Sequence, residues 1–351
     1  MEGAKKGGLQ AIAALVHESS RRWVHCPDLG GPFGPIGHIL SMNSRVHPKY
    51  KTKYRVSNWA EYDRALVRRG DITLWISPDG ADSWTPSPSG ERGGQQKFSD
   101  QAIETARVLR LVFNLPLRQA EGFLRSVLSL MALDLEAPDH TTLSRRSQSL
   151  NVDLHRVAHD KPIHLIIDST GLSIVGEGEW AAAKYGGRGR RGWKKLHLGV
   201  DRSGVIIAEV LTDGNADDAR TALGLIDEMD DVASFTADAA YDTIAIYDAA
   251  TARGAKVIVP PRSSATRSKR PGARDPTVRR VGKVGRRQWK KESGSHQQAR
   301  VENTFFRYKS IIGDRLRARH PKSQKAEAVI ACNILNQMLE IGRPESFAIC
   351  P

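Results

Sequence analysis

The spacing of apolar residues changes near residue 160 and predicts a helical part followed by a mixed part. Between residues 51 and 155, apolar side chains recur every three or four positions, as along one face of a helix. Asn58 and Ser99 stand where they can cap two of these helices, and Gly70 is a stop signal. The predicted helices cover residues 58–68, 100–113 and 117–133, with a short one from Thr141 or Thr142. The third is expected to bury Phe123, Val127, Leu130 and Met131.

From residue 161 onward, short β-branched runs separated by turn residues predict strands. The first run reads as a strand buried on both faces, because Ile163, Leu165, Ile166 and Ile167 follow one another closely. A last helix is expected from Gln324, capped by Ser323, with Ile330, Ile334, Met338 and Ile341 as its apolar face. The predicted strands are 163–172, 193–200, 205–212, a short one ending at Asp238, and 256–259, with helices after the third, fourth and fifth.

This order, three strands and then alternating helices and strands, predicts an α/β ribonuclease-H-like mixed sheet flanked by helices. We expect a poorly structured extension over residues 1–50, with Met42 as the natural start or a flexible arm as the alternative. Residues 51–155 would form a mostly helical, helix-turn-helix-like DNA-binding domain, the alternative being a plain packing domain. Residues 156–345 would form the catalytic domain, and 346–351 a tail.

Charge indicates the class of partner. The 351 residues carry a formal net charge of +14, which points to a polyanion: nucleic acid first, an anionic membrane second. No apolar run approaches the ~20 residues of a membrane span, so nucleic acid is favoured. The cysteines, Cys26, Cys332 and Cys350, form neither a disulfide framework nor a zinc motif. We therefore expect a cytoplasmic, nucleoid-associated protein.

The positive charge is concentrated between residues 262 and 300, where thirteen Lys and Arg residues face only Asp275 and Glu292. Such a run is typical of a solvated loop, and here it would clamp phosphates beside the catalytic residues. Trp289 within it either stacks on a base or serves as a buried anchor. A second, Gly-spaced basic loop contains Lys184, Arg188, Arg190 and Arg191.

Three acidic residues stand in settings that suggest chemistry. Asp168 follows the first apolar run, Asp238 ends a later strand, and Glu302 lies on a predicted helix; they are separated by 70 and 64 residues. An Asp before Gly171 could also be a simple turn residue. Two Asp and a Glu would form an oxygen-only site for Mg²⁺ or Mn²⁺. Two such ions ~3.5–4 Å apart activate a water or a 3′-hydroxyl at a phosphodiester. Asp242 is better placed as a helix N-cap, and His197 needs no catalytic role.

These segments resemble the DDE transposases of bacterial insertion sequences, in particular the insertion-sequence-five family. The resemblance runs from about residue 51 to about residue 345. The motifs that carry it are 166–172, 176–180, 193–198, 237–243, 260–263, 301–303 with Lys309, and, upstream, 58–59, Tyr62, 69–71, 112–115 and 122–123. The likeness implies a catalytic, metal-binding triad of Asp168, Asp238 and Glu302 that holds two Mg²⁺ or Mn²⁺ ions. It also implies double-stranded DNA as partner and a homodimer or higher oligomer on paired DNA ends.

The chain departs from the family pattern at three positions. Ala239 stands where the family usually has Gly, and Ser295 and Gln298 stand where Tyr and Arg often precede the Glu. Arg300 is expected to supply the missing positive charge. Lys309 would contact a phosphate, with an ion pair to Glu302 as the alternative. The expected DNA contacts are Lys309, Arg300, Arg307, Arg145, Arg146, Lys194, Lys195 and Arg262.

The function expected from this resemblance is cleavage at the ends of an insertion sequence and joining of the 3′-hydroxyls to target DNA. Two alternatives remain at this point. One is a nuclease of the same fold that only hydrolyses nucleic acid, and the other is an inactive DNA-binding repressor.

Overall fold

A computed structural model describes most of the chain after residue 52, and residues 55–347 form one compact unit. The expectations for the N-terminal extension, for Met42 and for the basic residues 184–191 lie outside the described residues. A short two-stranded ribbon pairs β1 (Lys53–Val56) with β8 (Ser346–Ile349), so the predicted tail contains a strand. The described ranges are 53–76, 83–87, 90, 93–155, 161–175, 192–229, 231–266 and 272–349.

A mixed six-stranded sheet forms the centre of this unit, in the order β4-β3-β2-β5-β6, and β7 pairs with the far end of β2. β3 and β4 run antiparallel to their neighbours, whereas β5 and β7 run parallel to β2. The predicted order of strands and helices is confirmed, and it is consistent with the expected ribonuclease-H-like fold. The strands are β2 (Ile163–Ile174), β3 (Trp193–Val200), β4 (Ile206–Asp213), β5 (Val232–Thr236), β6 (Lys256–Ile258) and β7 (Arg315–Leu316).

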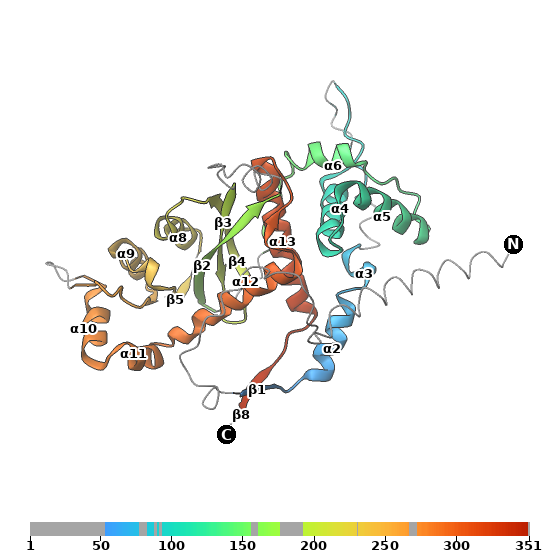
Figure 1. Cartoon of the computed structure of the whole chain (residues 1–351). Helices are drawn as coiled ribbons and strands as arrows, with labels where there is room; N and C mark the ends of the chain where they lie inside the picture. Colours follow the sequence, from blue (N-terminus) through green and yellow to red (C-terminus); the bar gives the residue numbers. More distant parts are fainter. Residues whose placement is uncertain are drawn as a thin grey trace, which may run out of the picture. The chain divides into compact units, whose positions relative to one another are not determined.

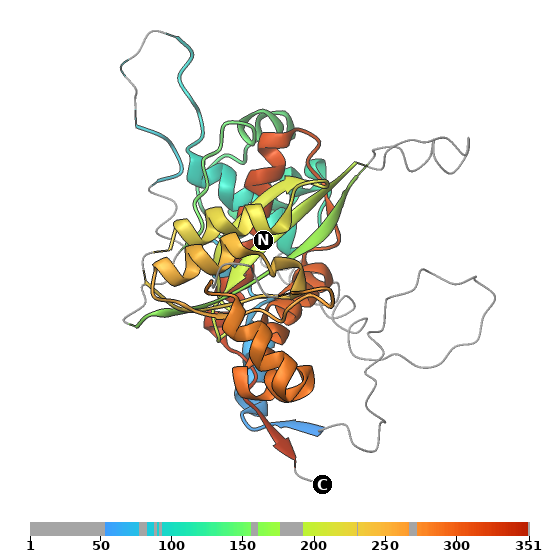
Figure 2. The same cartoon turned by 90° about the vertical axis from the view of Figure 1, so that its left-hand side faces the viewer.

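Helices cover both faces of the sheet, as Figure 1 shows. Leu165 and Ile167 of β2 pack with α8 and α9 on one face, and Ile166 and Leu172 pack with α12 and α13 on the other. The prediction of a strand buried on both faces is therefore confirmed. Figure 2 looks onto α8 and α9, which lie side by side in front of the sheet. The helices are α8 (Asp218–Asp227), α9 (Ile244–Ala252), α12 (Ala299–Ile311) and α13 (Pro321–Ile341).

The N-terminal helices share a core with the sheet, because α4 packs against α13. Arg107 of α4 is buried, and its guanidinium lies 3.9 Å from the buried Glu327 carboxylate of α13. Glu327 also accepts backbone N–H groups from Arg317 and Ala318. Because the buried Glu327 carboxylate accepts several hydrogen bonds, its position is fixed. Its contact with Arg107 therefore connects the N-terminal helices to α13. The helices are α2 (Trp59–Arg68), α3 (Ile72–Trp75), α4 (Asp100–Val112), α5 (Leu117–Leu130) and α6 (His140–Arg146).

The predicted caps are partly correct. Ser99 caps α4 by accepting the Ala102 N–H, as expected. Asn58 precedes α2 but does not cap it, since its side chain bonds the backbone of Arg343 and Glu345 instead. α6 begins at His140, one residue before the predicted start, and its cap is Asp139.

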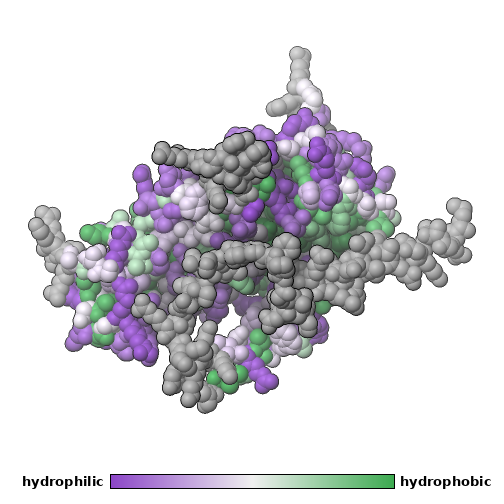
Figure 3. Space-filling view, in the orientation of Figure 1, coloured by the Kyte–Doolittle hydropathy of each residue, from purple (hydrophilic) through white to green (hydrophobic). Residues whose placement is uncertain are grey.

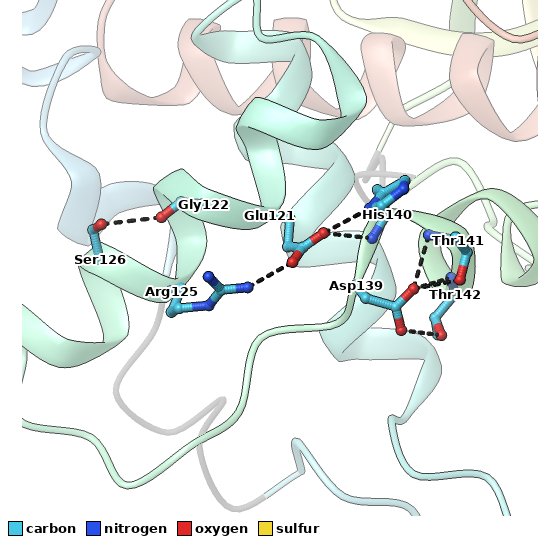
Figure 4. A network of polar contacts seen from close by, with 8 residues as sticks. All are labelled: Glu121, Gly122, Arg125, Ser126, Asp139, His140, Thr141 and Thr142. Carbon is cyan, nitrogen blue, oxygen red and sulfur yellow. Dashed lines mark hydrogen bonds and ion pairs between the residues drawn. The ribbon is translucent and has the colours of Figure 1, made fainter.

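Figure 4 shows the junction between α5 and α6. The Asp139 carboxylate accepts the N–H groups of Thr141 and Thr142. Glu121 of α5 accepts the backbone N–H of His140 at 2.9 Å and lies 2.8 Å from its ring Nδ1. These bonds fix the start of α6 to α5, which the spacing of apolar residues does not indicate.

Two predicted helix faces are wrong in part. In α5, Leu130 is exposed, and Leu124, Val127 and Leu128 are buried. α13 begins at Pro321 and is buried nearly all round, because α4 covers one side and β4 the other. Ser323 therefore lies inside the helix, where its hydroxyl bonds that of Ser147.

The predicted basic loop over residues 262–300 is wrong for most of its length, since it contains α10 (Asp275–Val284) and α11 (Arg286–Ser293). Trp289 of α11 is buried, so it is the anchor and not a base-stacking platform. Figure 3 shows hydrophilic side chains along the visible side of α10 and α11, with smaller apolar areas among them.

Asp242 connects the segment that contains α10 and α11 to the sheet. Its fully buried carboxylate accepts two bonds from Arg274, at 2.6 and 2.5 Å, and one from the Arg262 N–H. Asp242 is therefore not the predicted N-cap of α9, a role that Thr243 fills. No described helix is both long enough and apolar enough to cross a bilayer.

Replacement of Asp242 by alanine is expected to destabilise the protein by about 3–5 kcal/mol, because it leaves the Arg274 charge half-buried without a partner. Urea unfolding measures this loss, and hydrogen exchange over residues 275–293 should rise. Asp248→Ala, at an exposed position of α9, is the matched control. Equal stability of the two variants would contradict the assigned role.

Glu209 of β4 makes stability depend on pH. Burial, and then the charge of Glu228, raises the pKa of Glu209 to about 7, and one of its oxygens is buried without a hydrogen bond. A raised folded-state pKa stabilises the protein at low pH, and this contribution is lost as pH rises through about 7. Glu209→Gln should therefore have a higher Tm than the parent at pH 8 and a smaller advantage at pH 5. Exposed Glu61→Gln should show no such trend.

Candidate active site

The pairing of β2 with β5 brings Asp168 and Asp238 together. The parallel register aligns Ile166 with Thr236, and each aspartate follows two residues later. Neighbouring strands lie about 4.8 Å apart, so the two side chains emerge from adjacent backbones. Asp168 lies within β2 and not at its end, because the strand continues to Ile174. Asp238 follows β5 by two residues and accepts the Ala240 N–H at 2.8 Å.

The third acid, Glu302, lies in the first turn of α12. Gln298, just before this helix, donates a hydrogen bond to the Ile167 carbonyl at 3.2 Å. Ile167 directly precedes Asp168, so this bond holds the start of α12 beside the strand that carries Asp168. Val301 is fully buried and Glu302 is exposed, which places the carboxylate on the outer side of the helix.

The electrostatic environment of Asp168 includes the other two acids. Burial, together with the charges of Asp238 and Glu302, raises the pKa of Asp168 to about 6, against the lowering effect of the Ser169 N–H. Over the described ranges, none of the three carboxylates forms an ion pair with a Lys, Arg or His. Their negative charge is therefore not neutralised by any cation among the described residues.

A fourth acid, Asp218, is the first residue of α8. The N-cap of α8 is Asp217, which accepts the Arg220 N–H. Asp218 instead accepts hydrogen bonds from the Ser169 hydroxyl and the Lys195 ammonium, both at 3.1 Å, and its charge also raises the pKa of Asp168. The alternation along β2 and β3, which puts Ser169 and Lys195 on one face, is the signal that could have located it.

His197 lies beneath this acid and is completely buried. Its Nε2 is 2.9 Å from the Thr212 hydroxyl, and its Nδ1 is 3.8 Å from the Asp218 carboxylate. Burial lowers the pKa of His197, which favours the neutral ring. His197 thus supports the position of Asp218 through packing.

Arg300 and Lys309 are the expected DNA contacts that stand beside Glu302 on α12. Both are exposed, and neither forms an ion pair in the described part of the chain. The alternative ion pair between Lys309 and Glu302 is not formed. Arg145, near the end of α6, is likewise exposed.

The other expected DNA contacts are bonded within the protein. Arg307 is half-buried and donates to the Leu335 carbonyl, and burial lowers its pKa to about 10. Arg146 donates to the Phe98 carbonyl and pairs with Asp100. Arg262 donates to the carbonyls of residues 239 and 240, next to Asp238.

The two lysines of β3 are also engaged. Lys194 pairs with Asp213 at 2.5 Å. Lys195 bonds the Ala216 carbonyl as well as Asp218. These two cations hold the turn after β4 against the sheet, so their positive charge is largely used inside the protein.

The donor set of the site suits a hard divalent cation. Carboxylate oxygens are the ligands that Mg²⁺ and Mn²⁺ prefer, and three un-neutralised acids favour a bound cation. Within the ranges that the structure describes, no group of three His, Cys, Asp or Glu side chains is arranged to hold an ion. Asp238 and Glu302 are exposed, so their carboxylates are accessible to a cation from solvent.

Comparison with protein families identifies the chain. Residues 67–177 match one family described as a transposase DDE domain, and residues 159–337 match a second family of the same description. The second match covers half of the chain and includes Asp168, Asp238 and Glu302. It implies a dependence on divalent metal ions and DNA as the partner. The assignment to the insertion-sequence-five family and to bacteria stays a prediction. The chain belongs to the DDE transposases.

Proposed function

We propose that this transposase binds the terminal inverted repeats of an insertion sequence, cleaves the DNA at the ends and joins the 3′-hydroxyls to target DNA. The observation that supports this proposal is that Asp168 of β2 feels the negative charges of Asp238, just after β5, and of Glu302 on α12. No cation of the described residues forms an ion pair with any of the three carboxylates.

Asp168, Asp238 and Glu302 would hold the two Mg²⁺ or Mn²⁺ ions. When bound, such a pair activates a water or a 3′-hydroxyl and stabilises the leaving oxygen. The protein's own part is to orient the carboxylates. The Ser169 N–H holds one oxygen of Asp168, and the Gln298 bond to Ile167 keeps α12 in place.

Arg300 and Lys309 would hold phosphates next to the cleaved bond, because they flank Glu302 and carry free charges. The exposed Arg145 and the basic helices α10 and α11 would add further phosphate contacts. We assign Arg307, Arg146, Arg262, Lys194 and Lys195 to positioning, since their side chains are already bonded within the chain. A homodimer or higher oligomer on paired DNA ends completes the proposal.

Loss of any one acid should abolish cleavage and leave DNA binding nearly unchanged. Asp168→Asn, Asp238→Asn and Glu302→Gln should each lower the cleavage rate at least about 10²- to 10³-fold, the effect of removing one group that stabilises transition-state charge. Cleavage of labelled element ends with Mg²⁺ or Mn²⁺ measures the rate, and fluorescence anisotropy measures binding. Asp217→Asn, which removes the charge of an acid outside the triad and keeps a residue that can cap α8, is the control. Wild-type cleavage by Asp168→Asn would refute the proposal.

A strand-transfer assay with precut ends separates a transposase from a plain nuclease. The proposed function requires joined products when precut ends and target DNA are mixed with the protein and metal. A nuclease of the same fold gives shortened DNA without joining, and an inactive repressor gives a bound complex without either product.

Lys309→Gln should weaken binding to DNA ends and reduce the slope of log K against log salt by about 0.9 for the one phosphate contact removed. The matched control is Lys256→Gln, at an exposed position of β6. Anisotropy titrations between low and moderate salt give both slopes. Equal slopes for the two variants would show that Lys309 does not contact a phosphate.

A further inference from the structure

A hollow of about 710 Å³ lies at the end of the sheet where β3 begins and α13 starts. Its volume falls within the range of about 300–1,000 Å³ typical of sites for small ligands. The lining includes Ile174, Trp193, Asn215, Arg319 and Gln324. The proposed cleavage reaction uses none of these residues.

Trp193 is an exposed aromatic side chain on a rigid base. It is 54% exposed, yet two glycines make room for its ring. A Cβ at Gly171 would lie 2.5 Å from the ring, and one at Gly214 would lie 3.0 Å from its Nε1. Glycine inside a strand often marks a close approach, and Gly171 lies within β2. The ring is thus fixed against the sheet while much of its surface stays accessible.

Gln324 offers a hydrogen-bond acceptor without a partner. The residue is only 1% exposed, and its Nε2 donates to the carbonyls of Ala318 and Arg319. These two bonds determine the orientation of the amide, so Oε1 is the remaining atom. Oε1 is buried and accepts no hydrogen bond within the structure. A buried acceptor of this kind is stabilised by an N–H donor from a ligand.

The beginning of α13 supplies a site for an anion. The helix has 21 residues, and the side chain of its N-cap residue, His320, makes no capping hydrogen bond. Free N–H groups and the helix dipole at such an end favour a phosphate. Arg319 is exposed and forms no ion pair in the described ranges. The acid in the lining, Asp213, is already paired with Lys194.

An aromatic platform, an acceptor for N–H groups and an anion site together match the base and the phosphate of a nucleotide. We propose that this hollow binds one unpaired nucleotide of a DNA strand. The base stacks on Trp193 and donates an N–H to Gln324, and a phosphate lies between Arg319 and the start of α13. This inference rests on the proposed function, which makes DNA the occupant.

The distance between Asp168 and the hollow determines how long a single-stranded DNA extension must be to reach it. Ile174 lies six residues along β2 from Asp168, which corresponds to about 20 Å. At 3.4 Å per stacked nucleotide, about six nucleotides cover this distance. A single-stranded extension of eight nucleotides at a DNA end should therefore reach Trp193, and a blunt end should not.

The test compares the full-length protein with Trp193→Ala and Trp193→Phe in EDTA, so that no cleavage occurs. The probes are fluorescein-labelled DNA ends, either blunt or with an extension of eight deoxyadenosines. In the parent, the extension should tighten binding about tenfold or more, the scale of one base stacked on an aromatic ring. Trp193→Ala should lose this gain, and Trp193→Phe should keep most of it. Trp59→Ala removes a similarly exposed tryptophan on α2 and should leave the gain from the extension unchanged.

A second readout detects the stacking itself. 2-Aminopurine at the sixth position of the extension should be quenched by the parent and not by Trp193→Ala. Arg319→Gln should weaken binding of the extension and reduce its salt dependence. The proposal is overturned if Trp193→Ala retains the full gain, or if free deoxyadenosine monophosphate displaces the extension at equal concentration. Because the assay omits metal, its failure leaves the cleavage and strand-transfer tests of the proposed function unaffected.

Discussion

The burial of β2 on both faces is the constraint on which the site depends. Neighbouring strands on both sides and helices above and below fix its position, so the direction of the Asp168 side chain is set by the whole sheet. The same burial withdraws water from this carboxylate and raises its pKa. Among the described residues, the adjacent Ser169 N–H donates a hydrogen bond to it, and no Lys, Arg or His pairs with it. This part of the fold therefore carries negative charge that a bound cation would balance.

Local sequence signals predict the elements that depend on local interactions. The apolar run before Asp168 identifies β2, and Ser99 identifies the start of α4, because strand burial and helix capping depend on residues close in sequence. The three acids were predicted from their positions at strand ends and on a helix, and the resemblance to a known family implied that they form a triad. Helices α10 and α11, within residues 262–300, were not predicted. The ion pair between Asp242 and Arg274 that holds them in place joins residues far apart in sequence. Asp218 was missed for the same reason.

The net positive charge of the chain suggests more DNA contacts than its accessible lysines and arginines can make. Several arginines and lysines are used to satisfy carbonyl groups and acids in the interior, and burial lowers the pKa of Arg107 and Arg307. A guanidinium that donates to a backbone carbonyl is not available to a phosphate unless that bond is broken. Charge counts thus indicate the class of partner correctly, whereas accessibility decides which side chains meet it.

The buried contact between Arg107 and Glu327 determines how such proteins can diversify. α4 and α13 belong to opposite ends of the chain, yet they enclose one continuous apolar interior. If the first 150 residues were exchanged for those of a relative, a different surface would pack against α13. The buried Glu327 would then lose its Arg107 partner. New specificity for DNA ends is therefore expected to arise by substitutions on exposed positions, or by joint replacement of both termini, and not by exchange of the N-terminal part alone.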